Sequence, residues 1–300
     1  MNRGASAFEL GRSPFFCYNQ CNKAERKIDM GKRIGIVGTG NMGSAILRGI
    51  VESNYVRPSE LMVYDISKKK LQQLNEEYDG QLRTAQDCLQ IAIESDIIVL
   101  CVKPNFVEEV IGQLRPGLNG KAVVSIAAGW TLDRLEAALA GSGATCMRVM
   151  PNTPAMVGEG MTAVCDESSL SEEDFDFAKG IFDAVGKTVV LPEKMFDGAT
   201  AISGSSPAYV YMMIEAMADA GVREGIPRKK AYEMAAQAVL GSALMVLSTG
   251  SHPGELKDAV CSPAGTTIEA VEVLERKGFR SAIMEAMRAC AEKSREMSAK

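Results

Sequence analysis

A glycine-rich turn directly follows the first strand-like apolar run of the chain. Residues 34–43 read Ile-Gly-Ile-Val-Gly-Thr-Gly-Asn-Met-Gly, which places the spacing G-x-G-x-x-G on Gly38, Gly40 and Gly43. In a strand–turn–helix unit the first glycine permits a tight turn, the second lets the backbone approach a pyrophosphate, and the third lets the helix pack closely on the strand. Residues 44–52 have a helical pattern, and the start of such a helix attracts phosphate. The pattern predicts a dinucleotide site. The alternative is a glycine-rich turn with the same sequence pattern and a purely structural role.

The alternation of strand and helix patterns continues to about Leu191. Continuous apolar runs are typical of strands covered on both faces, and their alternation with helices favours a parallel, doubly wound sheet. After Pro192 no convincing strand is found, and apolar residues recur at helical spacings. The expected strands are Arg33–Val37, Leu61–Tyr64, Ile97–Val102, Ala122–Ile126, Cys146–Met150, Met161–Cys165 and Thr188–Leu191; the expected helices after the sheet are Phe196–Glu224, Arg228–Leu247, Gly254–Val260, Gly265–Arg276 and Arg280–Ser298.

These patterns divide the chain into three parts. Residues 1–30 mix polar residues with one aromatic cluster and show no periodicity, which predicts a disordered, dispensable extension. Residues 31–191 are expected to form a dinucleotide-binding domain and residues 192–300 a helical domain. The fold class is therefore α/β, with an N-terminal Rossmann-type doubly wound sheet followed by an all-helical C-terminal domain. The helices from Phe196 to Leu247 carry apolar residues on more than one face, which predicts an obligate dimer.

Composition disfavours several classes of function. The formal charge of −5, from 38 acidic and 33 basic residues without a basic block, disfavours nucleic acid as a partner. The longest apolar stretches, such as Ile97–Val102, are too short to cross a bilayer, and no apolar segment resembling a secretion signal follows Met1. The eight scattered cysteines and the single His252 offer no convincing zinc set, so no metal is expected. Unpaired cysteines and no secretion signal favour a cytoplasmic protein without a membrane partner.

Further nucleotide contacts are expected at the carboxyl ends of the strands, where ligands bind in open α/β sheets. Asp65 ends the second strand, 22 residues after Gly43, where an acid usually holds the ribose of NAD. Ser67 and the three lysines after it suit the 2′-phosphate of NADP instead, so NADPH and NADH both stay open. The expected cofactor contacts are Gly38, Thr39, Gly40, Asn41, Met42, Gly43, Asp65, Ser67, Val102, Lys103, Pro104, Ala127 and Asn152. The alternatives are an ordinary exposed lysine at 103 and an asparagine that only stabilises its turn at 152.

A second candidate site lies in the helical half. Residues 262–267 read Ser-Pro-Ala-Gly-Thr-Thr and form a turn between two short amphipathic segments. Hydroxyls and free backbone N–H groups at a helix start are a natural seat for a carboxylate. The alternative is plain N-capping of the helix by serine or threonine.

Taken together, these motifs resemble the pyrroline-5-carboxylate reductase family over residues 33–295. The stretch from Leu256 to Glu275 is the most specific. The glycine loop and the segments 102–104, 150–154 and 203–209 resemble family motifs in the same order. Two positions depart from the pattern: Ser206 stands where the family more often has glycine, and Asp65 is unexpected because the family commonly favours NADPH.

The resemblance implies a reaction and a role for each part. The family reduces the cyclic imine 1-pyrroline-5-carboxylate to L-proline by hydride transfer from NAD(P)H, the last step of proline biosynthesis. By resemblance, Ser262 and the backbone of Gly265, Thr266 and Thr267 bind the substrate carboxylate, and Thr267 is the catalytic residue, hydrogen-bonded to the ring nitrogen. The helical domain would then be a dimerisation and substrate domain that forms an interleaved dimer, and dimers would assemble further.

The chemistry of the residues agrees with an imine substrate. Reducing a ketone needs a proton donor, yet the segment from Phe196 to Val222 contains no lysine and His252 lies in a turn. A cyclic imine can be protonated before or during binding, so the protein has mainly to orient it and exclude water. Two other hypotheses stay open: a reductase of another small imino or oxo acid, and a non-catalytic dinucleotide-binding protein. Turnover of 2-oxo acids would indicate the first, and cofactor binding without hydride transfer the second.

Overall fold

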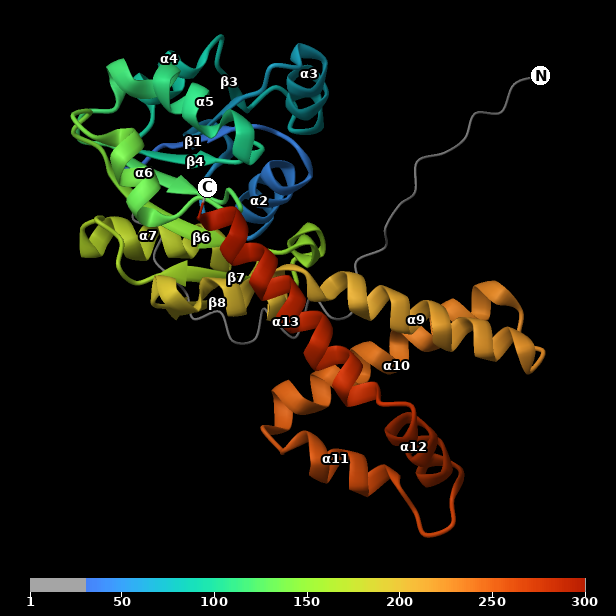
Figure 1. Cartoon of the computed structure of the whole chain (residues 1–300). Coiled ribbons are helices and arrows are strands. Elements are labelled where there is room, and N and C mark those ends of the chain that lie inside the picture. Colours follow the sequence, from blue (N-terminus) through green and yellow to red (C-terminus); the bar gives the residue numbers. More distant parts are fainter. Residues whose placement is uncertain (1–30, 300) are drawn as a thin grey trace, which may run out of the picture. The chain divides into compact units, whose positions relative to one another are not determined.

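The computed structural model describes residues 31–299, and the predicted extension of residues 1–30 lies outside the described residues. The described chain contains one eight-stranded sheet with the strand order β3-β2-β1-β4-β5-β6-β7-β8 (Figure 1). Neighbouring strands pair in parallel except β6 and β7, which are antiparallel. The strands are β1 (Ile34–Val37), β2 (Leu61–Tyr64), β3 (Arg83–Thr84), β4 (Ile97–Leu100), β5 (Ala122–Ser125), β6 (Thr145–Met150), β7 (Gly160–Cys165) and β8 (Gly186–Leu191).

The register of the central strands brings their carboxyl ends to one level. Val37 at the end of β1 pairs with Tyr64 at the end of β2 and with Leu100 at the end of β4. Leu100 in turn pairs with Ser125 at the end of β5. The four loops that begin after these residues therefore start side by side along one edge of the sheet, which is where this fold places its ligand.

Helices cover the sheet and are started by side chains that accept backbone N–H groups. Ser67, Asp87, Thr131 and Ser171 cap α3, α4, α6 and α7 in this way. Such caps satisfy N–H groups that have no carbonyl partner inside the helix. The helices of this half are α2 (Asn41–Glu52), α3 (Lys68–Glu77), α4 (Cys88–Glu94), α5 (Val107–Leu114), α6 (Leu132–Leu139) and α7 (Glu172–Asp183).

The antiparallel pair β6–β7 departs from the expected parallel sheet. The connection between these strands runs only from Pro151 to Glu159 and contains a 3-10 turn, Thr153–Val157. A parallel neighbour needs a crossover of a dozen or more residues, usually with a helix, so this short connection reverses the chain. The two-residue strand β3 was not predicted, because its residues show no apolar run.

The segment after β8 is helical, as expected, but its first helix is broken. Its elements are a 3-10 turn (Glu193–Met195), α8 (Phe196–Ala199), the π-helical segment η6 (Thr200–Gly204), α9 (Ser206–Arg223), α10 (Arg228–Thr249), α11 (Pro253–Val260), α12 (Thr266–Arg276) and α13 (Phe279–Ser298). The N–H of Ser205 donates to the carbonyl of Thr200 at 2.8 Å, five residues back, which defines the π turn. Pro207 has no N–H to donate to the carbonyl four residues back, and its ring crowds that carbonyl, so the predicted helix Phe196–Glu224 is interrupted at Ser205.

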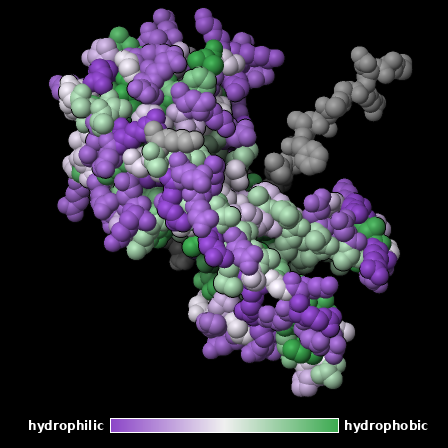
Figure 2. All heavy atoms as spheres, in the orientation of Figure 1, coloured by the Kyte–Doolittle hydropathy of each residue, from purple (hydrophilic) through white to green (hydrophobic). Residues whose placement is uncertain are grey.

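The helical segment has little interior of its own. In α9 only Ala218 is buried, in α10 only Ala231 and Ala235, and none of the described residues of α11, α12 and α13 is buried. Large apolar side chains stand exposed instead, including Met212 at 69%. Figure 2 shows apolar residues continuing over the surface of α9 and α10. By length and composition α10 is also long enough to cross a membrane, which the apolar stretches of the sequence did not predict. One such helix is weak evidence for a membrane span. These faces need a partner surface.

Candidate functional site

The three glycines of the first loop are used in different ways. Gly38 has φ +96°, and a Cβ there would lie 2.7 Å from the carbonyl oxygen of Cys101. A Cβ on Gly43 would lie 2.0 Å from the carbonyl oxygen of Gly38, so this glycine lets α2 approach β1. Gly40 has φ −71°, which any residue adopts, and a Cβ there would meet no atom within 4 Å. The fold itself therefore requires Gly38 and Gly43, whereas the space in front of Gly40 is open to a ligand.

The start of α2 differs from those of the four capped helices. Gly40 provides no side-chain cap, and the first turn has no acidic residue. Ser44 makes the first intrahelical bond, from its N–H to the carbonyl of Gly40 at 2.9 Å, so the N–H groups of Asn41, Met42 and Gly43 precede it. Three such groups at the positive end of a helix bind an anion well.

Asp65 braces this loop from the end of β2. One carboxylate oxygen accepts the N–H of Thr39 at 2.8 Å and its hydroxyl at 3.0 Å, and the other accepts the N–H of Ser67 at 2.9 Å. Partial burial acts to raise the pKa of Asp65, but these donors outweigh it and, with the charge of Lys70, hold the pKa below its ordinary value. Asp65 is thus an ionised support of the turn, with most of its acceptor capacity used inside the protein.

A cavity of about 300 Å³ opens beside the glycine loop. Thr39, Gly40, Asn41 and Lys70 are among its lining residues. Among the residues that the structure describes, the ammonium group of Lys70 forms no ion pair, whereas the nearby Arg48 is paired with Glu77 at 2.9 Å. The cavity thus combines free helix N–H groups with one available cation, which suits a phosphate.

The loops after β4 and β5 meet through Trp130. Its indole N–H donates to the carbonyl of Pro104 at 3.0 Å, and its backbone N–H donates to the carbonyl of Ala127 at 3.3 Å. Ala127 is buried, Val102 and Pro104 are half-buried, and Lys103 is exposed. The predicted contacts Val102, Lys103, Pro104 and Ala127 therefore lie on two loops that one buried tryptophan ties together.

The side chain of Asn152 forms its hydrogen bonds within the protein. Its side-chain NH₂ donates to the carbonyl of Ser203 at 2.9 Å, and its side-chain oxygen accepts the N–H of Met161 at 2.9 Å. Only 8% of the residue is exposed. Of the two interpretations of this asparagine, the geometry favours the one in which it stabilises its turn, because both ends of its amide are engaged. It also joins the end of β6 to the π-helical segment η6.

The turn before α12 is strained and offers free polar groups. The N–H of Gly265 donates to the carbonyl of Ser262 at 3.0 Å, and Ala264 has φ +55°, a left-handed conformation that non-glycine residues adopt at a cost of about 1–3 kcal/mol. Gly265 precedes the helix without a side-chain cap, so neither Thr266 nor Thr267 caps α12. Plain N-capping by these hydroxyls is therefore wrong for this helix, and its first N–H groups are open.

Within one chain the two candidate sites do not meet. No hydrogen bond or ion pair of the described residues joins the turn Ser262–Thr267 to residues 33–191. The helix that carries the turn, α12, packs on α13. A complete site that uses both the glycine loop and this turn therefore requires either movement or a second chain.

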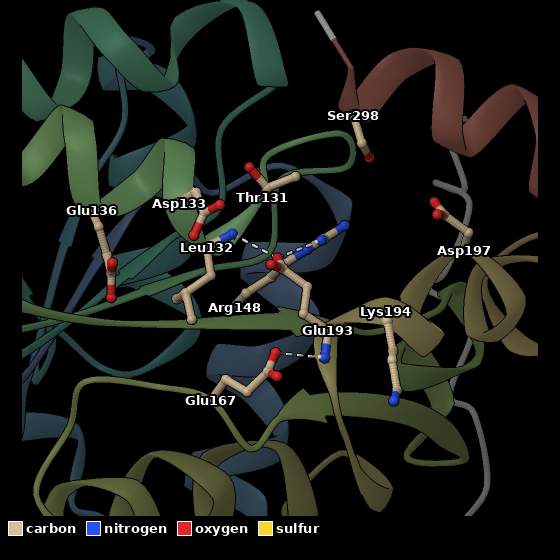
Figure 3. Close-up of a pocket in the computed structure, with 10 residues that line it drawn as sticks. All are labelled: Thr131, Leu132, Asp133, Glu136, Arg148, Glu167, Glu193, Lys194, Asp197 and Ser298. Carbon is tan, nitrogen blue, oxygen red and sulfur yellow. Dashed lines mark hydrogen bonds and ion pairs between the residues drawn. The ribbon is translucent and has the colours of Figure 1, made fainter.

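A partly buried ion pair near the base of the helical segment was not predicted. Arg148 in β6 donates to Glu193 at 2.7 Å, and the same Glu193 oxygen accepts the N–H of Leu132 at 2.6 Å (Figure 3). The guanidinium lies 4.7 Å from the ring centre of Phe196. An arginine within the apolar run Cys-Met-Arg-Val-Met of β6 was the available signal, since a charge buried in a strand requires a partner.

Two family models match the chain. The model described as pyrroline-5-carboxylate reductase dimerisation matches residues 193–297, and the one described as NADP oxidoreductase, coenzyme F420-dependent, matches residues 33–129. The first therefore covers the helical segment and the second the glycine loop with the strands around it.

Curated relatives and solved structures resemble the chain over most of its length. The pyrroline-5-carboxylate reductase of Escherichia coli is 50% identical over 90% of this chain and 99% of its own, and that of Arabidopsis thaliana is 41% identical over 89% and 95%. A Plasmodium falciparum pyrroline carboxylate reductase with NADP bound superposes with a TM-score of 0.80 at 35% identity, covering 89% of this chain and 98% of that one. A pyrroline-5-carboxylate reductase from Coxiella burnetii gives a TM-score of 0.83 at 32% identity, with coverages of 90% and 99%.

Proposed function

The chain belongs to the pyrroline-5-carboxylate reductase family, and from this premise we propose how its own residues carry the reaction. The enzyme reduces 1-pyrroline-5-carboxylate to L-proline with NAD(P)H, the last step of proline biosynthesis, so the predicted family, fold class and reaction are confirmed. We propose that the cofactor pyrophosphate binds at the start of α2 and that the substrate binds at the start of α12. The observation that carries this proposal is Gly40, since no described residue of the protein prevents a side chain there.

The reaction needs little acid–base chemistry from the protein. When bound, NAD(P)H supplies the hydride that is added to the imine carbon. The two electrons of the C=N π bond become the nitrogen lone pair, so a protonated imine yields the neutral amine of proline. His252 has a structural role, because its Nδ1 accepts the N–H of Gly254 at 3.0 Å as the cap of α11. Orientation of the ring and exclusion of water then remain the main tasks.

The start of α12 provides the substrate contacts in this proposal. The open N–H groups of Thr266 and Thr267, together with the backbone of Gly265 and the hydroxyl of Ser262, bind the carboxylate. The hydroxyl of Thr267 hydrogen-bonds the ring nitrogen, only a few ångströms from the carboxylate. The left-handed Ala264 fits this role, because strained backbone of this kind is found preferentially at ligand sites.

The adenosine end favours NADPH over NADH in our proposal. An acid selects NAD when its carboxylate is free to accept the ribose hydroxyls, but both oxygens of Asp65 already accept donors from Thr39 and Ser67. Lys70 and the hydroxyl of Ser67 stand close by and suit a 2′-phosphate. The solved relative from Plasmodium falciparum has NADP bound, which supports the same preference.

The helical segment carries the family's dimerisation domain, and we propose that it forms a dimer that completes the site. The exposed apolar faces of α9 and α10 would be buried against a second chain rather than in a membrane, so the enzyme would be cytoplasmic. In this arrangement the turn Ser262–Thr267 of one chain faces the glycine loop of the other. This accounts for the separation of the two candidate sites within one chain.

One assay tests the function directly. Oxidation of NADPH and of NADH is followed separately with pyrroline-5-carboxylate and with a set of small 2-oxo acids. We expect turnover with pyrroline-5-carboxylate and a higher kcat/KM with NADPH. Turnover of 2-oxo acids without pyrroline-5-carboxylate would indicate a different substrate, and cofactor binding without any oxidation would indicate a non-catalytic protein.

A further inference from the structure

The loop after β5 reaches from Ile126 to Gly129 and is held from one side by Trp130. This tryptophan is 3% exposed, and its two hydrogen bonds tie the loop to Pro104 in the neighbouring loop. The guanidinium of Arg134 covers its ring at 4.1 Å. The loop contains Ala127, one of the proposed cofactor contacts, so its position decides how well the flat end of a dinucleotide is seated.

The last turn of α13 holds the same loop from the other side. Gly129 has φ +76°, and a Cβ there would lie 3.3 Å from the Cβ of Met297 and 3.4 Å from its carbonyl oxygen. Ser298, one residue further, lines the same cavity as Thr131, whose side chain caps the helix after the loop (Figure 3). The end of α13 thus rests on the backbone of Gly129, and a methyl group added there would require Met297 to shift by a few tenths of an ångström.

Two contacts set where α13 ends. The hydroxyl of Ser294 donates to the carboxylate of Asp197 in α8 at 2.5 Å, and the thiol of Cys290 donates to the hydroxyl of Ser205 at 3.2 Å. Both acceptors lie in the segment that follows β8, and α13 packs along α8 and η6. Because these two contacts hold the helix, the position of its last turn relative to Gly129 is defined.

We propose that the end of α13 is a positioning element of the cofactor site, with Met297 fixing the loop 126–129 against Trp130. The inference rests on the proposed function, in which this loop contacts the cofactor. The last turn of α13 contacts the loop at Gly129, on the cofactor side of the proposed site, so its effect is expected on cofactor affinity. Displacement of a positioning loop by a fraction of an ångström already weakens binding of a ligand that must fit it.

The first test compares two left-handed glycines. Gly129→Ala adds a methyl group against Met297, whereas Gly141→Ala adds one at φ +77° with no atom within 4 Å. Both variants carry similar backbone strain, and Gly129→Ala adds the crowding against Met297, so it should lose somewhat more stability than Gly141→Ala. We expect Gly129→Ala alone to raise the KM for NADPH by about 3- to 10-fold, with kcat and the KM for pyrroline-5-carboxylate changed less than about twofold. Equal KM values for NADPH in the two variants would overturn the proposal.

A second pair of variants acts from the helix. Ser294→Ala releases the end of α13 from Asp197, and Ser281→Ala in the same helix removes only the hydroxyl that bonds Glu285 at 2.9 Å. Ser294→Ala should raise the KM for NADPH and shift the emission of Trp130, the one tryptophan of the chain. Combined with Gly129→Ala, its effect should be less than additive, because both changes act on the same contact. Full additivity, or an emission unchanged from that of Ser281→Ala, would contradict the proposal.

A third variant separates this inference from the proposed function. Gly40→Val blocks the proposed pyrophosphate position and should abolish NADPH binding measured by titration calorimetry. If Gly40→Val binds NADPH as the wild type does, the proposed cofactor site and the role of α13 both fall. If Gly40→Val does not bind while Gly129→Ala binds normally, only the role of α13 falls.

Discussion

The carboxylate of Asp65 holds Thr39 by two hydrogen bonds, 2.8 Å from the backbone N–H and 3.0 Å from the hydroxyl. By its position Asp65 would indicate a preference for NAD. Its carboxylate is instead bound to the glycine loop and stabilises it. In the sequence Asp65 indicated NAD, whereas the lysines after Ser67 indicated NADP. In the structure Asp65 supports the loop, and Lys70 remains available to bind an anion.

This relationship predicts a pH dependence of stability. The pKa of Asp65 is lower in the folded chain than in the unfolded one, so its ionised form stabilises the fold above about pH 4. That contribution is lost as the pH falls through the folded-state pKa. Asp65→Asn should therefore be less stable than the wild type at pH 7, and the difference in unfolding free energy should shrink toward pH 3. A constant difference in urea titrations across this range would mean that the charge of Asp65 is not involved.

Gly40→Val is expected to separate folding from binding. A valine fits the extended backbone at this position, where an added Cβ would have no protein atom within 4 Å, so the melting temperature should stay within about 2 °C of the wild type. The KM for NADPH should rise at least about 100-fold, since the side chain would fill the space proposed for the pyrophosphate. Gly43→Val is the matched control with the opposite result, because its side chain would meet the carbonyl of Gly38 and should unfold the domain. Thermal melts and steady-state kinetics of both variants test this contrast.

Thr267→Ala should lower turnover with little effect on stability. One hydrogen bond to the ring nitrogen contributes about 1.5–3 kcal/mol in the transition state, which corresponds to about 10- to 100-fold in kcat. Because no side chain caps α12, loss of the hydroxyl should leave the melting temperature unchanged. Thr267→Ser retains the hydroxyl and should recover most of the activity. A variant with full turnover and reduced stability would show that Thr267 is structural.

The ion pair between Arg148 and Glu193 should matter for stability rather than for catalysis. Glu193→Ala leaves the guanidinium of Arg148, 4% exposed, without its charge partner, and also removes the acceptor of the N–H of Leu132. The expected loss is about 3–5 kcal/mol of unfolding free energy. Glu136→Ala, which alters an exposed acid of the same cavity, should change it by less than about 0.5 kcal/mol. Chemical denaturation measures the unfolding free energy of both variants. Equal losses in the two variants would contradict a stabilising role of the ion pair.

A site shared between chains can be tested by mixing two inactive variants. Gly40→Val lacks the proposed cofactor position and Thr267→Ala lacks the proposed catalytic hydroxyl, so each homodimer should be nearly inactive. A mixed dimer contains one site in which both parts are intact if the site is built from two chains. Unfolding and refolding the variants together should therefore restore up to about a quarter of the wild-type activity, because about half of the randomly formed dimers are mixed and each has one intact site of two. No gain over the separate variants would place both halves of the site in one chain.

The parts of the structure that follow from local rules were predictable from the sequence. The glycine spacing defines the turn after β1, and the apolar runs locate seven strands to within a few residues. The reversal between β6 and β7 follows from a connection that is too short for a crossover, and the sequence patterns alone did not reveal it. The structural role of Asn152 depends on its hydrogen bonds to Met161 and Ser203, and the role of Arg148 depends on its ion pair with Glu193. Such pairs form across long stretches of chain, and no local pattern specifies them.

The contact between Gly129 and Met297 also has a consequence for how the protein is made. Domains fold as they leave the ribosome, at about 5–20 residues per second, so the nucleotide half can form while the helical half is still being synthesised. Met297 follows Gly129 by 168 residues in the sequence (297 − 129). A nascent chain would thus display the loop 126–129 before its neighbour has been translated, and firm capture of the nucleotide would wait until α13 has formed.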